Sequence, residues 1–190
     1  MTAPTAEPVT RVSVPVKLLG LLLAGAAVSI ALGVYGKVHD PTGEQPYTLF
    51  FSDTINLKVW FATIAVAFAL VQLLTALRIY GKIHIPRTAP PWLGDAHRLT
   101  GTIAFGFTVP VVYQCLWALG FQSTDTRVLL HSLLGCFFFG AFTIKVLAVR
   151  TNGLPNWVLP VVGGTVFTTL VLIWTTSSVW FWREFGFPSF

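Results

Sequence analysis

The chain has 190 residues, of which 54% are hydrophobic and 10% are charged, and its formal net charge is +5. Its mean hydropathy of +0.73 excludes a soluble globular domain, because there are too few polar residues to cover the surface of a core. The basic residues are scattered rather than clustered, so the positive charge does not indicate a nucleic-acid partner, and the lipid bilayer is the expected environment.

Five apolar stretches follow one another along the chain, each long enough to cross a hydrocarbon layer about 30 Å thick as a helix of roughly 20 residues. We expect these spans at about 18–35, 57–80, 99–120, 128–149 and 158–181. They form one predicted domain, 17–184, preceded by a flexible cytoplasmic tail, 1–16. Lipid offers no partner for backbone N–H and C=O groups, so the predicted fold class is all-α, a polytopic membrane helical bundle with five transmembrane helices.

Lys and Arg residues are unevenly distributed between the two ends of the predicted helices. The end that carries the N-terminus holds most of the 12 basic residues: Arg11, Lys17, Arg78, Lys82, Arg87, Arg98, Lys145 and Arg150. The opposite end holds most of the 7 acidic residues. The positive-inside rule therefore predicts a multi-pass protein of the plasma (cytoplasmic) membrane, with a cytoplasmic N-terminus and an external C-terminus.

All 4 histidines occur in two motifs, each present twice. The motifs are Tyr-Gly-Lys-x-His-x-Pro, at 35–41 and 80–86, and His-x-x-x-Gly-x-x-x-Phe-Gly, at 97–106 and 131–140. Tracing the spans places His39 and His131 at the external end, and His84 and His97 at the cytoplasmic end. Imidazole is a common ligand of haem iron, so a bis-histidine site must pair residues at the same end of the bundle.

The residues around these histidines favour a flat ligand. Gly101 and Gly135 lie four positions after the two helical histidines, on the same helix face, where a missing side chain leaves room for a macrocycle. Phe105 and Phe139 continue that face as apolar walls. Cationic residues near the pairs are candidates to hold haem propionates. These are Lys37 and Arg127 at the external end, and Lys82, Arg87 and Arg98 at the cytoplasmic end.

We therefore expect an integral membrane electron-transfer protein that holds one or two b-type haems. His131 and His97 are the principal expected ligands, with His39 and His84 as their partners. A single haem would use the pair at the external end, His39 and His131. Such a protein would link a quinone to a membrane or membrane-attached redox partner. The chain has no hydrolytic or transferase motif, so whether it catalyses a reaction stays open.

Other interpretations stay open as well. A glycine four residues after a histidine is also typical of close helix contacts, in a cofactor-free structural or assembly subunit of a larger respiratory membrane complex. Gln72, Thr75 and Gln114 either bond between helices or line a quinone pocket. A small transporter has less support, because the spans contain few charges. Cys115 and Cys136 are expected to be buried apolar side chains.

Several stretches resemble an uncharacterised family of bacterial multi-pass integral membrane proteins. They are 39–42, 97–101, 125–135 and 159–164. The resemblance covers most of the chain from about residue 34 onward and implies a bacterial membrane protein without an assigned activity. His97-Arg98-x-x-Gly101 is more distantly similar to the motif that opens haem-bearing helices in transmembrane b-type cytochromes. Those proteins often place a second ligand further along the same helix, where this chain has Pro110 and Val111.

Overall fold

The structure is a computed structural model that describes residues 13–44, 47–84 and 88–188. In these ranges the regular elements are all helical. They are α1 (Val14–Val38), α2 (Thr54–Ile79), α3 (Leu93–Gln114), η1 (Cys115–Leu119), α4 (Thr126–Arg150), α5 (Val158–Trp174), η2 (Thr175–Val179) and α6 (Trp180–Phe185). The segments η1 and η2 are π-helical. Five continuous helices are long and apolar enough to cross a membrane, which confirms the predicted five-span helical architecture.

Four of the five spanning helices begin earlier than the hydropathy predicts, and α5 begins at the predicted residue, Val158. α1 starts at Val14, so its first turn includes residues assigned to the tail, and Pro15 is tolerated there because its missing N–H has no helical partner to lose. α3 starts at Leu93, which places His97 one turn inside the helix. Asp53 and Asp125 cap α2 and α4, since their carboxylates accept hydrogen bonds from backbone N–H groups in the first turn.

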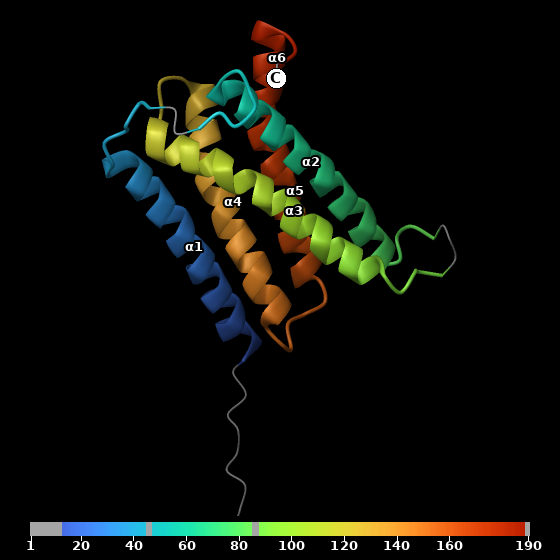
Figure 1. Ribbon diagram of the computed structural model, residues 1–190. Helices are drawn as coiled ribbons and strands as arrows, with labels where there is room; N and C mark the ends of the chain where they lie inside the picture. The colour runs from blue at the N-terminus through green and yellow to red at the C-terminus, as the bar shows by residue number, and fades with distance from the viewer. Residues whose placement is uncertain (1–12, 45–46, 85–87, 189–190) are drawn as a thin grey trace, which may run out of the picture.

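The bundle has two halves, visible in Figure 1. α1 packs along α4, α2 packs along α3, and α5 joins the halves through its contacts with α4 and α2. The approach of α1 to α4 depends on Gly25 and Gly140, since a Cβ on Gly25 would lie 2.8 Å from the Gly140 carbonyl oxygen. Such contacts between small residues are a common means of packing helices in membranes.

A buried apolar cluster lies where α2, α4 and α5 meet, and it fixes the centre of the bundle. Its members are Ala65, Val66, Ala69, Phe138, Ala141, Val166 and Leu170. We call the end of the bundle where α1, α3 and α5 begin the N-terminal end. The opposite end, which carries η1, η2 and α6, is the C-terminal end (Figure 1).

Candidate functional site

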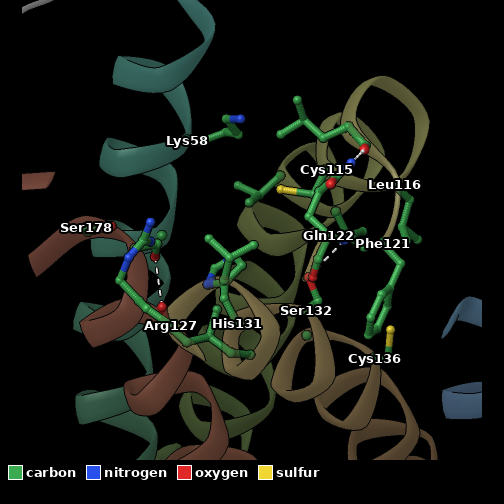
Figure 2. Close-up of a pocket in the computed structure, with 18 of the residues that line it drawn as sticks. Lys58, Cys115, Leu116, Phe121, Gln122, Arg127, His131, Ser132, Cys136 and Ser178 are labelled. Carbon is green, nitrogen blue, oxygen red and sulfur yellow. Dashed lines mark hydrogen bonds between the residues drawn. The ribbon is translucent and has the colours of Figure 1, made fainter. Parts of the chain in front are cut away.

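A cavity of about 330 Å³ lies between the helices at the C-terminal end, and all five spanning helices contribute to its wall. The wall is largely apolar. Its polar and charged members, several of which Figure 2 labels, are Lys58, Gln122, Arg127, His131, Ser132, Ser177 and Ser178. A mainly apolar pocket with a few convergent polar groups is the usual form of a small-molecule site, and such pockets enclose about 300–1,000 Å³.

Both π-helical segments of the described chain line this cavity, through Cys115 and Leu116 in η1 and Ser177 and Ser178 in η2. A π turn contains an extra residue, which widens the helix and redirects its side chains, and such turns are frequent at functional sites. The two segments therefore mark the cavity in addition to its charged residues, which lie on α2 and α4.

The sequence provides a local cause for each π segment. Pro110 lies inside α3 shortly before η1, and it has no N–H to donate to the preceding turn. In η2 the hydroxyls of Thr175 and Ser177 donate to carbonyl oxygens of the preceding turn, over 2.8 Å in each case. These side chains compete with backbone N–H groups for the same acceptors, which weakens the regular helical ladder.

His131 is partly buried in the cavity wall, and its Nδ1 lies 3.1 Å from Thr176 Oγ1. The Thr176 hydroxyl lies 3.0 Å and 2.9 Å from the carbonyl oxygens of Leu172 and Ile173, to which it donates its own hydrogen. With its hydrogen directed to those carbonyl oxygens, the hydroxyl accepts from the imidazole. In the neutral imidazole this arrangement puts the hydrogen on Nδ1 and the lone pair on Nε2 of His131.

Lys58 and Arg127 bring two positive charges to the same cavity. The guanidinium of Arg127 is held in place, because Nη1 donates to the Thr176 carbonyl oxygen over 2.9 Å and the group lies 3.8 Å from the centre of the Trp180 ring. Among the described residues, no Asp or Glu lines the cavity. Two cations in an apolar wall favour a ligand with an anionic or electron-rich polar group.

The two glycines predicted to lie beside the helical histidines have different surroundings. A Cβ on Gly135 would meet nothing within 4 Å, and this glycine lines the cavity as expected. A Cβ on Gly101 would lie 2.8 Å from Oε1 of Gln72. The space beside His97 is therefore filled by a side chain from α2 rather than left for a ligand.

The N-terminal copy of the motif is a helix-packing network. His97 Nδ1 lies 2.7 Å from Thr75 Oγ1, so its imidazole bonds to a threonine hydroxyl on a neighbouring helix, as His131 does. Gln72 donates to the His97 carbonyl oxygen and, over 2.6 Å, to Thr100 Oγ1. Of the two uses proposed for Gln72 and Thr75, bonding between helices is the one the structure contains.

The expected histidine pairs do not face each other across a common space. His39 is absent from the cavity wall, and its ring lies between Tyr35 and Trp117, with centroid distances of 5.0 Å and 4.8 Å. Its Nε2 is 3.1 Å from the Trp117 carbonyl oxygen. His84 is exposed in the link after α2. Neither pair therefore lines one cavity in the described part of the chain, and a bis-histidine haem, which needs two imidazole nitrogens about 4 Å apart on either side of iron, stays a prediction.

The other predicted site residues separate into three groups. Arg127 and Gly135 join His131 at the cavity. Phe105 and Phe139 pack against the buried cluster with ring centroids 5.9 Å apart, and neither lines this cavity, although Phe139 lines a second hollow beside it. The remaining cations lie elsewhere. Lys37 and Lys82 are exposed, Arg98 pairs with Asp95 on the surface of α3, and Arg87 lies outside the described residues.

Lys58 is the main residue that sequence reasoning missed. It is not among the candidate residues predicted above, because the predicted span begins at residue 57 and puts Lys58 at its very edge. In the structure α2 begins at Thr54, so Lys58 lies one turn inside an apolar span, where an ionisable residue indicates function. Cys115 and Cys136 were expected to be inert packing residues. Both are free thiols, and both line the cavity.

The comparisons with known proteins bear on the whole transmembrane region. A family model described as a family of unknown function (DUF6529) matches residues 18–189. No curated protein and no solved structure matches the chain. The match covers nearly all of the five spanning helices, but it transfers no activity, so the function has to be argued from the cavity.

Proposed function

The chain belongs to this family of unknown function (DUF6529), and on that premise we propose that it is an integral membrane electron-transfer component that binds the headgroup of a lipid-soluble quinone in the cavity. The observation that carries the proposal is the convergence of Lys58, Arg127 and the Nε2 lone pair of His131 on one apolar space without an acidic residue among its described lining.

The chemistry of a quinone matches these groups. Its ring needs apolar walls, its two carbonyl oxygens accept hydrogen bonds, and those oxygens gain negative charge when electrons arrive. Lys58 and Arg127 supply cationic donors, which form stronger hydrogen bonds than neutral donors do. The cavity volume of about 330 Å³ is near the lower limit for ligand pockets and favours a single-ring headgroup over a macrocycle.

A bound quinone would supply two-electron, two-proton redox chemistry, and the residues of this chain would bind it and handle the protons. Arg127 is oriented in advance by Trp180 and the Thr176 carbonyl oxygen, so little ordering is needed when it meets the ligand. His131 would accept a proton from a quinol hydroxyl at Nε2, because Thr176 holds the other ring hydrogen on Nδ1. The electrons would pass to a redox centre on a partner protein.

The proposed orientation follows from the basic residues. Because Lys and Arg are concentrated at the N-terminal end, we place that end in the cytoplasm of a bacterial cell and the cavity near the external surface of the plasma membrane. The redox partner would then dock on the external side.

The proposal is tested by measuring which redox groups the purified protein holds. Organic extraction followed by mass spectrometry identifies any bound quinone. A titration with a tail-less benzoquinone measures affinity through quenching of Trp180, which lies in the cavity wall. Lys58→Met and Arg127→Met should each weaken binding of the benzoquinone about tenfold, because each removes a donor to its carbonyl oxygens, and this loss corresponds to about 1.4 kcal/mol.

A charge-matched control is Arg98→Met, which removes a cation that pairs with Asp95 on the surface of α3. This variant should bind the ligand like the wild type. An absorption spectrum with a Soret band would return haem b to consideration. A colourless protein that neither retains nor binds quinone would refute the proposal and favour the assembly-subunit alternative, which the Gln72 and His97 packing network also supports.

A further inference from the structure

A second hollow adjoins the cavity on the outside of the bundle. This groove encloses about 370 Å³ between α1 and α3. Leu32, Val112 and Leu116 line both the cavity and the groove, so they form a shared wall between them. Phe139 of α4 also lines the groove, and its remaining members are Tyr35, Val109, Tyr113 and Trp117.

The groove exists because α1 is tied to α4 rather than to α3. α1 packs along α4 through Gly25 and meets the end of α3 through η1. At that end the fit is tight, since a Cβ on Gly36 would lie 2.9 Å from Leu116 Cδ2. Figure 1 shows α1 and α3 converging at the C-terminal end and diverging away from it. The result is a wedge that is open along the side of the bundle, with Leu116 at its narrow end.

The link between η1 and α4 forms part of the cavity wall. Phe121 and Gln122 of this link line the cavity. The Phe121 N–H donates to the Gly36 carbonyl oxygen over 2.6 Å, which holds the link against the end of α1. Gly120 allows the turn, because its φ of +68° lies in the region that favours glycine.

We propose that the groove holds the isoprenoid chain of the quinone whose headgroup occupies the cavity, and that this ligand enters from the bilayer past Leu32 and Leu116. This inference rests on the proposed function. The cavity has room for a ring but not for a long chain, and the groove is the adjoining space with wholly apolar and aromatic walls. Apolar atoms must fill a groove that faces lipid, and a chain anchored by its headgroup in the adjoining cavity is held beside the groove for as long as the headgroup is bound.

The test compares two ligands in bilayer nanodiscs: a tail-less benzoquinone and a quinone of the same ring with a long isoprenoid chain. The double variant Val109→Phe, Tyr113→Trp adds bulk to the groove at two exposed positions of α3 that do not line the cavity. The matched control is Ile30→Phe on α1, an exposed position that lines neither hollow. Thermal unfolding and size-exclusion profiles confirm that both variants fold. Affinities are measured by isothermal titration.

The double variant should lose about tenfold or more in affinity for the long-chain quinone and change less than about twofold for the tail-less one. The control should change neither. Equal losses for both ligands, or no loss for the long-chain quinone, would overturn the inference and leave the headgroup site intact. Wild-type protein that binds neither ligand would instead overturn the proposed function on which the inference rests.

Discussion

Two copies of one sequence motif, His-x-x-x-Gly, lie at opposite ends of this bundle and have different surroundings. In both copies the histidine Nδ1 bonds to a threonine hydroxyl from a neighbouring helix: Thr75 for His97 and Thr176 for His131. The surroundings of the glycines differ. Gln72 fills the space beside Gly101, whereas the space beside Gly135 stays open. The motif therefore sets the orientation of the imidazole, and the adjacent helices decide whether a cavity forms there.

The difference has a cause in the neighbouring segments. At the N-terminal end, α2 and α3 pack closely along their length and exchange polar contacts between their side chains. At the C-terminal end, η1 and η2 widen the two helices that face His131. The same histidine and glycine spacing thus produces a packing contact between regular helices and a cavity between π-helical ones.

The largest expected effects come from placing a side chain at each of the two motif glycines, Gly135 and Gly101. Gly135→Leu places an isobutyl group in the cavity and should reduce quinone affinity about a hundredfold or more, since overpacked sites resist insertion. Gly101→Leu should instead collide with Gln72 and lower the free energy of unfolding by about 1–3 kcal/mol. Ligand titration and thermal unfolding of both variants measure the two effects. Loss of binding in the Gly101 variant alone would reverse our assignment of the two ends.

Replacing the threonines that bond to the two helical histidines separates a ligand-binding role from a structural one. Thr176→Val removes the acceptor for the His131 Nδ1 hydrogen, so the imidazole can shift its hydrogen to Nε2 and stop accepting from a quinol hydroxyl. Affinity for the reduced ligand should then fall about five- to tenfold, while affinity for the oxidised ligand, which needs donors, changes less.

Thr75→Val is the matched control at the other end, where the same kind of bond to His97 would be lost. It should lower stability by about 1–3 kcal/mol and leave the ratio of reduced to oxidised affinity unchanged. A ratio that is unchanged in Thr176→Val would show that His131 has only a structural role.

The smallest expected effect concerns Tyr47, which lies in the link between α1 and α2 and forms hydrogen bonds with α3. Its hydroxyl donates to the Pro110 carbonyl oxygen over 3.2 Å, and its own carbonyl oxygen accepts from Gln114 Nε2 over 2.9 Å. Burial, and then the neighbouring Tyr113, raise the pKa of Tyr47 above its usual value. The folded protein therefore favours the protonated phenol, and this contribution to stability is lost as the pH rises above about 10.

Tyr47→Phe should remove that loss at high pH and lower stability at neutral pH by about 0.5–1.5 kcal/mol. Thermal unfolding measured between neutral and strongly alkaline pH checks both effects. A wild type and variant with parallel pH profiles would exclude Tyr47 as the titrating group.

The five spans were predictable because apolar runs of this length have no other stable form in lipid. Their ends were not, since caps such as Asp53 and Asp125 and the proline in the first turn of α1 extend the helices into less apolar sequence. His131, Gly135 and Arg127 line one cavity because they share one helix, and their expected role in holding a cofactor stays a prediction.

The pairing of histidines could not be predicted from the spacing. His39 lies four residues after Tyr35, which brings the two rings into a stack at the end of α1, and Trp117 from η1 covers the other side. Gln72 belongs to a different helix from Gly101, so its position depends on how α2 and α3 pack. Contacts between neighbouring helices therefore cannot be predicted from hydropathy and motif spacing alone.

One feature of the cavity gives the protein a natural chemical reporter. The chain contains 2 cysteines, and both thiols face the same interior space from different helices. A small lipid-soluble alkylating reagent that enters the cavity would meet both residues in the wall around the expected quinone ring. The alkylation rate of the unaltered protein would therefore measure how often the cavity is vacant, without an engineered label and without knowledge of the electron acceptor.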